Sequence, residues 1–276
     1  MPNARFNEGW MLTKVVMCPP QKEYFNIDET EKHNIRQRSD PDRAIEQHRR
    51  LRELLRNNGV EVIELPVLEG HPNSIFTMDT ALSLGDSFIQ LRMGLETRRG
   101  EELWMANVLL DMNLEKIGEV KYPGTAEGGD LIPAYPYFFI GLSGRTNAEG
   151  ARQIKHIVEK YGYEVRMVTV PKMHLHLGGA MTVIEDNTVL ACESIPEKYL
   201  AGFDVIRIKC ESFISGNVIN LGARRVIAES KNIETIEILR DYGFDVQTVD
   251  LSEFVKGSGG PSCLILPLRR EESIFE

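Results

Sequence analysis

The sequence predicts an α/β fold built from five similar units. A helix-like stretch that ends in glycine and is followed at once by a Val/Ile-rich run recurs along the chain, and no linker or charge block divides it. Glycine readily adopts the left-handed conformation that ends a helix, and β-branched runs favour strands. The recurring glycines are Gly59, Gly118, Gly162, Gly202 and Gly243.

Successive glycines are separated by 59, 44, 40 and 41 residues, which is the length of one supersecondary unit in a repeat protein. An ordinary α/β sheet also repeats helix, glycine and strand, so it remains the alternative. We expect a single domain spanning residues 1–276.

Local signals place individual elements. Asp40-Pro41 predicts the start of a helix that runs to about Asn58. Thr146 or Asn147 predicts the start of another. Turn residues predict hairpins around Gly85-Asp86, Glu185-Asp186-Asn187 and Gly222. The faces that we expect to be buried are Ala44, Ile45, His48, Leu51 and Leu55 on the first helix, and Ala151, Ile154, Ile157 and Val158 on the second.

The bulk composition excludes several classes of protein. The chain has 276 residues and a net charge of −9, which argues against a nucleic-acid-binding surface. No apolar run is long enough to cross a membrane, and the N-terminus lacks the apolar core of a signal peptide, so we expect a cytoplasmic protein. Its assembly into a homo-oligomer stays open.

Reactive or polar residues follow each of the five glycines by 9 to 20 positions. In a closed ring of five units, equivalent positions converge on one axis. A thiol, an imidazole, an amide and two carboxylates would then share one cavity, a set suited to covalent catalysis on a cation. The five residues are Asp79, Glu127, His176, Asn217 and Cys263.

Each residue also has a purely structural interpretation. Cys263 leads an apolar strand and could be a core cysteine, but the glycines before it allow close approach of a ligand. Glu127 could be solvated in a loop, and Asp79 could cap a turn. The other cysteines, Cys18, Cys192 and Cys210, are typical of small buried side chains.

His174 and His176 alternate with leucines and point to one face of a strand. His-x-His is also a metal-ligand pattern, but no other His or Cys has a compatible spacing. We therefore predict no metal, with His176 as the catalytic histidine. A satisfied buried histidine is the alternative.

Several segments match one family in order along the whole chain. They are AIEQH at 44–48, TRRGEE at 97–102, PGTAEGGD at 123–130, GLSGRTNAEGARQ at 141–153, LHLGG at 175–179 and GGPSC at 259–263. In these motifs the chain resembles the dimethylarginine dimethylaminohydrolases of the amidinotransferase, or pentein, superfamily.

The resemblance implies a five-bladed αβ propeller of ββαβ-type units around a central channel. It implies Cys263 as the nucleophile and His176 as the general acid and base, with Glu127 and Asp79 gripping a guanidinium group. It also implies a small guanidino substrate and no cofactor. Arg92 in LRMG and Arg145 in SGRTN fall where the family binds the substrate carboxylate.

The match is incomplete at the substrate end. Asn73, Met78 and Ser258 stand where the family usually carries acidic residues, and the run PNSIFTMD is closer to arginine deiminases. We expect Asn73 and Phe76 of this run to bind the substrate. The leading hypothesis is hydrolysis of Nω-methylated arginine to citrulline and an alkylamine. The alternatives are a short arginine deiminase that releases ammonia, and a non-enzymatic amino-acid sensor on the same scaffold.

Overall fold

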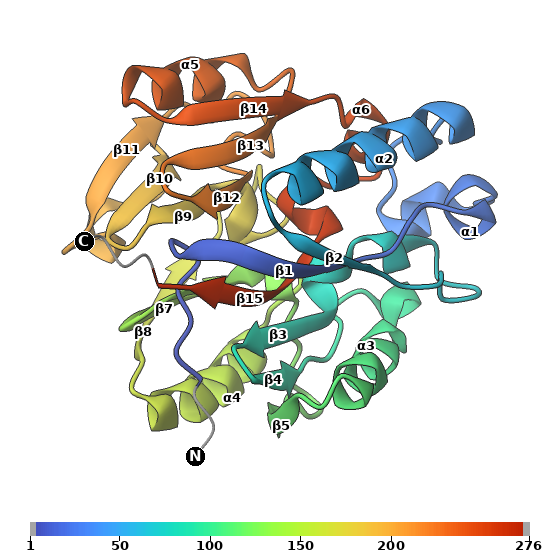
Figure 1. The fold of residues 1–276 in the computed structure, drawn as a ribbon. Coiled ribbons are helices and arrows are strands. Elements are labelled where there is room, and N and C mark those ends of the chain that lie inside the picture. The colour runs from blue at the N-terminus through green and yellow to red at the C-terminus, as the bar shows by residue number, and fades with distance from the viewer. Residues whose placement is uncertain (1–3, 273–276) are drawn as a thin grey trace.

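The computed structural model describes residues 4–272 and folds into five three-stranded sheets arranged as a ring (Figure 1). The fold is the five-bladed α/β propeller that the sequence predicts. The blades are β1 (Met11–Met17), β2 (Glu61–Glu64) and β15 (Leu266–Glu271); β3 (Ala81–Leu84), β4 (Ser87–Gln90) and β5 (Glu115–Glu119); β6 (Leu131–Ala134), β7 (Tyr137–Leu142) and β8 (Glu164–Thr169); β9 (Met181–Glu185), β10 (Thr188–Cys192) and β11 (Asp204–Ile208); and β12 (Val218–Gly222), β13 (Arg225–Glu229) and β14 (Asp245–Val249).

The five blades repeat one topology. In each blade the middle strand pairs antiparallel with one neighbour and parallel with the other. An antiparallel pair can be joined by a tight turn, whereas a parallel pair needs a crossover connection. In four blades this connection contains one of the longer α-helices. The first blade takes β15 from the C-terminal end of the chain, so pairing of β15 with β1 closes the ring.

The longer helices lie on the outside of the ring (Figure 1). The α-helices are α1 (Lys22–Phe25), α2 (Pro41–Asn57), α3 (Glu101–Asp111), α4 (Ala148–Val158), α5 (Ile233–Asp241) and α6 (Ser252–Val255). The short 3₁₀ helices are η1 (Thr30–His33), η2 (Pro72–Ile75), η3 (Thr77–Thr80), η4 (Glu96–Arg98), η5 (Gly128–Asp130), η6 (Glu159–Tyr161), η7 (Leu177–Gly179), η8 (Glu197–Tyr199) and η9 (Ser262–Leu264).

The predicted helix starts are confirmed. The Asp40 side chain accepts a hydrogen bond from the Arg43 amide at the start of α2, and Asn147 caps α4 in the same way. The predicted inward face of α2 is wrong at Ile45, which is 50% exposed. A helix turns about 100° per residue, so the buried stripe follows Ala44 and continues every three or four residues, and Ile45 points away from it.

The predicted glycine caps are confirmed at Gly59, Gly162 and Gly243, which all have positive φ after a helical segment. The prediction is wrong at Gly118, which lies inside β5. Asn113, at φ 63°, takes the left-handed position after α3 instead. Asparagine tolerates that conformation because its short side chain can hydrogen-bond locally. The three predicted hairpins are confirmed as β3–β4, β9–β10 and β12–β13.

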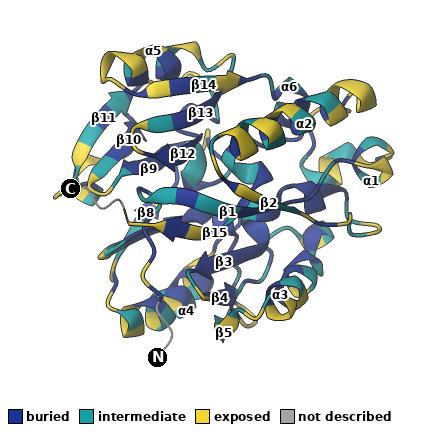
Figure 2. Ribbon diagram, viewed as in Figure 1, coloured by how far each residue is buried: buried dark blue, intermediate teal, exposed yellow. Residues whose placement is uncertain are grey.

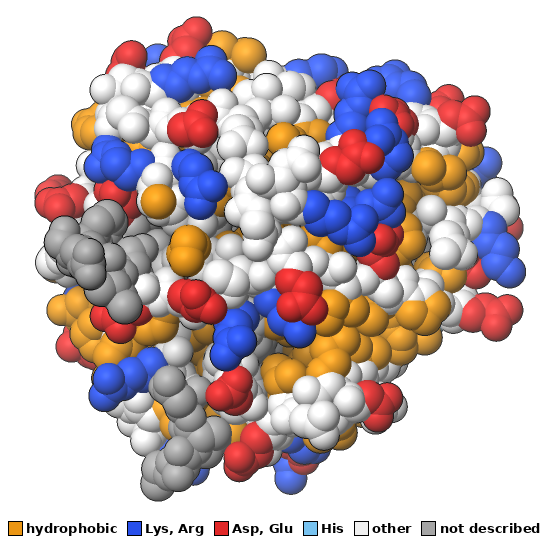
Figure 3. Space-filling view, viewed as in Figure 1, with side chains coloured by type: hydrophobic (Ala, Val, Ile, Leu, Met, Phe, Trp, Pro, Cys, Tyr) orange, Lys and Arg blue, Asp and Glu red, His pale blue; other side chains and the backbone are white. Residues whose placement is uncertain are grey.

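Strands near the centre of the ring are almost wholly buried, while α2, α3 and α5 expose their outer sides (Figure 2). On the face shown in Figure 3, basic and acidic side chains are interspersed, as along α2, where Arg49 and Arg50 both pair with Glu46. Within residues 4–272, no helix combines the length and the apolar character needed to cross a membrane.

Candidate active site

Five polar or reactive side chains lie in, or just before, the short turn that leads into a strand of each blade. Asp79 lies in η3 and Cys263 in η9, whereas Glu127 and His176 immediately precede η5 and η7. Asn217 immediately precedes β12. The turns η9, η3, η5 and η7 contact one another in that order. The ring therefore brings all five residues together, as their spacing in the sequence predicts.

A cavity beside Cys263 is lined from all five units, including by Gly129, His176 and Asn217. Two glycines are required for this close packing. A Cβ atom at Gly129 would lie 2.8 Å from the His176 ring, and one at Gly259 would lie 2.2 Å from the Phe76 ring. Both distances are far below van der Waals contact, so any larger residue would displace the site.

The His176 ring lies between two carboxylates. Its Nε2 is 2.8 Å from Oε2 of Glu127, and its Nδ1 is 3.7 Å from Oδ1 of Asp79. Burial disfavours the charged imidazole, but the carboxylates of Asp79, Asp130 and Glu127 outweigh that effect and raise the pKa of His176 to about 9. The ring is therefore a cation at neutral pH, ready to donate a proton.

Glu127 is fully buried and accepts several hydrogen bonds. The backbone amides of Gly94 and Leu95 donate to Oε1 at 2.9 and 3.1 Å, and Arg145 lies 3.5 Å away. Burial favours the neutral acid, yet the hydrogen bond and charge of His176 hold the pKa of Glu127 well below its usual range. Glu127 and His176 thus form a charged pair that fixes the ring orientation.

The Cys263 thiol faces two hydrogen-bond donors. The Gly260 amide donates to Sγ at 3.3 Å, and Nδ2 of Asn217 lies 4.0 Å from it. Burial, followed by the negative charge of Asp79, raises the pKa of Cys263 to about 12. The free protein therefore holds a neutral thiol at neutral pH, placed where two donors and any bound cation would stabilise a thiolate.

Arg98 is a site residue that the sequence interpretation missed. Its Nη1 donates to Oδ2 of Asp79 at 2.6 Å, and its Nη2 lies 2.7 Å from Oε2 of Glu101. All three side chains are buried. The signal lies in the motif TRRGEE, where an arginine precedes a glutamate by three residues across a helix start, which places the two on one side of the chain.

Replacing Arg98 by leucine is expected to lower the free energy of unfolding by about 3–5 kcal/mol, because buried carboxylates would lose their counter-charge. The exposed pair of Arg152 with Glu149, also three residues apart, is a matched control. We expect Arg152→Leu to change stability little, since exposed pairs contribute little. Urea unfolding of both variants measures this. Equal shifts in the two midpoints would contradict the assigned role.

Other predicted substrate-binding residues divide into two groups. Asn73, Phe76 and Arg145 line a second cavity, which shares His176 and Cys263 with the first and is also lined by Asp79 and Arg98. Arg92 is not brought to it: its guanidinium donates to the Gly124 carbonyl at 3.2 Å and lies 5.3 Å from the Tyr122 ring centroid. Oδ1 of Asn73 is buried and has no hydrogen-bond partner within the described part of the chain, so an acceptor is available there.

Asp130 is a second residue that the sequence interpretation missed. It accepts from the Leu177 amide at 2.9 Å and from the Ser143 hydroxyl at 2.6 Å. Burial raises the pKa of Asp130 to about 6. Because Leu177 directly follows His176, this carboxylate fixes the backbone that carries the imidazole. Its signal is the acidic end of the motif EGGD.

The ligand atoms of Asp79, Glu127 and His176 lie within 4.8 Å of one another, close enough for a bound cation. The two carboxylates already contact His176 and the buried guanidinium of Arg98. Their negative charge is therefore compensated by the protein itself.

Fold and site together define a five-bladed α/β propeller with a thiol, an imidazole and carboxylates in one cavity. Residues 19–270 match the family model described as N,N dimethylarginine dimethylhydrolase, eukaryotic. The N(G),N(G)-dimethylarginine dimethylaminohydrolase of Pseudomonas aeruginosa is 35% identical over 225 residues, covering 81% of this chain and 88% of the relative. That of Streptomyces coelicolor is 30% identical over 237 residues, covering 86% and 90%.

A solved structure agrees with these relatives. The Pseudomonas aeruginosa enzyme, as a cysteine-to-serine mutant complexed with citrulline, superposes with a TM-score of 0.82 at 32% identity, covering 93% of this chain and 99% of that one. The chain belongs to the dimethylarginine dimethylaminohydrolase family, and it is a hydrolase.

Proposed function

We propose that this protein hydrolyses Nω-methylated arginine to citrulline and an alkylamine through a covalent intermediate on Cys263. The observation that carries the proposal is that the half-buried Cys263 thiol lines one cavity with His176, which is itself paired with the buried Glu127 carboxylate. The proposed mechanism needs no cofactor. Family membership supports a guanidino substrate, and the relative bound to citrulline supports the product.

Binding of the cationic guanidinium beside Asp79 would offset the charge that disfavours the thiolate. The thiol proton leaves to solvent, and the thiolate is stabilised by the Gly260 amide and by Asn217. Cys263 then attacks the guanidinium carbon. The His176 imidazolium donates its proton to the departing amine, which breaks the carbon–nitrogen bond and leaves a thiouronium on sulfur.

Hydrolysis completes the cycle. His176, now neutral, takes a proton from a water molecule that attacks the thiouronium carbon. Collapse of the tetrahedral intermediate breaks the carbon–sulfur bond. The departing Cys263 sulfur takes the proton of the new hydroxyl, which restores the thiol and releases citrulline. The imidazolium is restored, and Glu127 keeps the ring in the orientation needed for both transfers.

The amino-acid end of the substrate would lie among Asn73, Phe76 and Arg145. The Arg145 guanidinium suits a carboxylate, because its contact with Glu127 at 3.5 Å is long and leaves its donors available. Oδ1 of Asn73 suits an ammonium or guanidinium N–H. Arg98 serves a different purpose here, since its bonds to Asp79 and Glu101 hold Asp79 in place.

Two residues of the segment 26–40, His33 and Asn34, line the cavity that also holds Asn73 and Arg145. The His33 carbonyl accepts from Nδ2 of Asn73 at 2.8 Å, and the Asn34 carbonyl accepts from Ser258 Oγ at 2.9 Å. We propose that this segment acts as a lid that opens to admit substrate. We further propose one catalytic domain over residues 1–276 and a cytoplasmic location, where thiols such as Cys18 and Cys192 stay reduced.

A substrate panel tests the proposal. The protein is incubated separately with arginine, monomethylarginine and asymmetric dimethylarginine, and citrulline, ammonia and methylamines are quantified, with Cys263→Ser as the blank. We expect citrulline and alkylamine from both methylated substrates, because the cavity holds both the nucleophile and a proton donor. Turnover of arginine alone would favour a short arginine deiminase. Binding without turnover of any guanidine would favour a sensor.

A further inference from the structure

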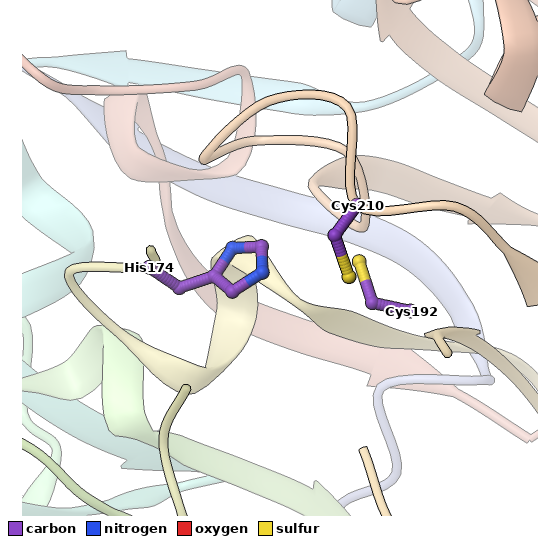
Figure 4. A group of neighbouring side chains, drawn as sticks. All are labelled: His174, Cys192 and Cys210. Atoms are coloured by element: carbon purple, nitrogen blue, oxygen red, sulfur yellow. The ribbon is translucent and has the colours of Figure 1, made fainter. Parts of the chain in front are cut away.

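A second cluster of reactive side chains lies outside the cavity described above. The ligand atoms of His174, Cys192 and Cys210 are all within 4.8 Å of one another. Figure 4 shows one nitrogen of the His174 ring directed toward the two sulfur atoms. The proposed reaction uses none of these three side chains.

The fold brings the three residues together from separate segments. Cys192 is the last residue of β10, and Cys210 follows β11 by two residues. The parallel register of these strands pairs Cys192 with Ile208, so Cys210 lies just past the same sheet end. His174 belongs to the segment that leads into η7, which adjoins β9 of this blade.

The hydrogen bonding of His174 defines its tautomer. Its Nδ1 is 2.9 Å from the Phe213 carbonyl, an acceptor only, so Nδ1 carries the proton. Nε2 then holds a lone pair. That atom is buried and has no hydrogen-bond partner anywhere in residues 4–272. A histidine whose other nitrogen donates to a backbone carbonyl, and whose free nitrogen faces thiols, has the arrangement of a metal ligand.

The donor set selects the type of ion. Two thiolates and a neutral imidazole suit a borderline-soft cation, whereas calcium and magnesium prefer oxygen ligands. A dication with two thiolates is also electrically neutral, which avoids burying a net charge. In a tetrahedral zinc shell the ligand atoms lie roughly 3.5–4 Å apart, so only a small closure of the present cluster is needed.

We propose that His174 Nε2 and the thiolates of Cys192 and Cys210 bind Zn²⁺. Binding releases the two thiol protons to solvent and forms one Zn–N and two Zn–S bonds. Cys210 is half-buried and gives access from the surface. The exposed Ser194 hydroxyl lies 3.0 Å from Cys210 Sγ. In the proposed site, this hydroxyl or a water molecule would be the fourth ligand.

Such a site would tie together segments that lead into the cavity. His174 precedes His176 by two residues, and its Nδ1 partner Phe213 precedes Asn217 by four. Zinc there cross-links these segments to the ends of β10 and β11. The ion stabilises the fold and takes no part in the chemistry at Cys263.

The test uses the full chain as the Cys263→Ser variant, which removes the thiol of the other cavity. The protein is reduced, stripped of metal and titrated with Zn²⁺ against a chromophoric chelator, and with Co²⁺, whose thiolate bonds give near-ultraviolet charge-transfer absorption. We expect one ion per chain and an increase of a few degrees in melting temperature with zinc, because a ligand that binds only the folded state stabilises it.

Adding Cys210→Ser should lower the zinc affinity by more than about 100-fold, since losing even an outer partner of a metal ligand costs 10–100-fold. This half-buried position tolerates serine better than Cys192 does. Adding His176→Gln instead should leave zinc affinity unchanged, which separates this site from the cluster of Asp79, Glu127 and His176. Loss of binding in His176→Gln but not in Cys210→Ser would overturn the proposal. The proposal would also be overturned if Cys192 and Cys210 form a disulfide and the protein still fails to bind zinc after that disulfide is reduced.

Discussion

Replacing Cys263 by serine is expected to reduce turnover of methylated arginine by about 10⁴-fold or more, because loss of a covalent nucleophile removes the whole two-step pathway. The fold should persist. Sγ accepts a hydrogen bond from the Gly260 amide and a long contact from Asn217, and a serine hydroxyl can accept the same donors. Steady-state release of citrulline by wild type and variant measures the effect.

Cys210→Ser is the matched control, since Cys210 and Cys263 are the two half-buried cysteines of the described chain. This variant should keep turnover, because Cys210 lies outside the cavity that holds His176. Mass spectrometry of wild type quenched during turnover should show the adduct on the peptide containing Cys263. Full activity in Cys263→Ser would refute the nucleophile assignment.

Replacing His176 by glutamine is expected to lower kcat by about 10²–10⁴-fold, the usual contribution of a positioned acid and base. Glutamine can still donate to Glu127 but cannot deliver or accept a proton. An S-alkyl isothiourea analogue of arginine, whose leaving group does not need the same proton, should still form the adduct in this variant. Its hydrolysis should be slow, so the adduct accumulates and is detected by its mass.

The pH dependence of kcat/KM gives an independent check on His176. The reactive form of the free protein pairs a thiolate with an imidazolium, while the pKa of Cys263 is about 12 and that of His176 is about 9. Below about pH 9 each pH unit raises the population of that form about tenfold, and above it the population levels off. We expect this break near pH 9 in wild type and its loss in His176→Gln. A break that persists in the variant would assign it to another group.

Local chemistry explains what could be predicted from the sequence alone. The caps Asp40 and Asn147, the glycine ends of three helical segments and the three hairpins depend on interactions within a few residues. The prediction that failed at Gly118 also concerns interactions between residues close together in the chain. Asn113, five residues before Gly118, adopts the left-handed conformation that ends α3. Gly118 lies inside β5, where a Cβ atom would be 2.6 Å from the Ile157 side chain, so only glycine fits there.

The fivefold repeat of the chain also allowed the residues of the active site to be predicted. Equivalent positions in a closed ring point to one centre, so the spacing of the five units is enough to predict the set from Asp79 to Cys263. The arginine that meets the substrate could not be chosen in this way. The resemblance implied both Arg92 and Arg145, whereas the structure places Arg145 in the cavity with His176 and Cys263 and directs Arg92 to the Gly124 carbonyl and the Tyr122 ring.

The sequence by itself determined the five-unit α/β organisation and the five residues that meet in the cavity, because both depend on local patterns repeated along the chain. Only the tertiary structure decided the partners of those residues. The shifted pKa values of His176 and Cys263 come from burial and from charges on other blades. The grouping of His174 with Cys192 and Cys210 comes from strand register across segments far apart in the chain. These contacts join residues that are far apart in the chain, so no spacing or local pattern in the sequence predicts them.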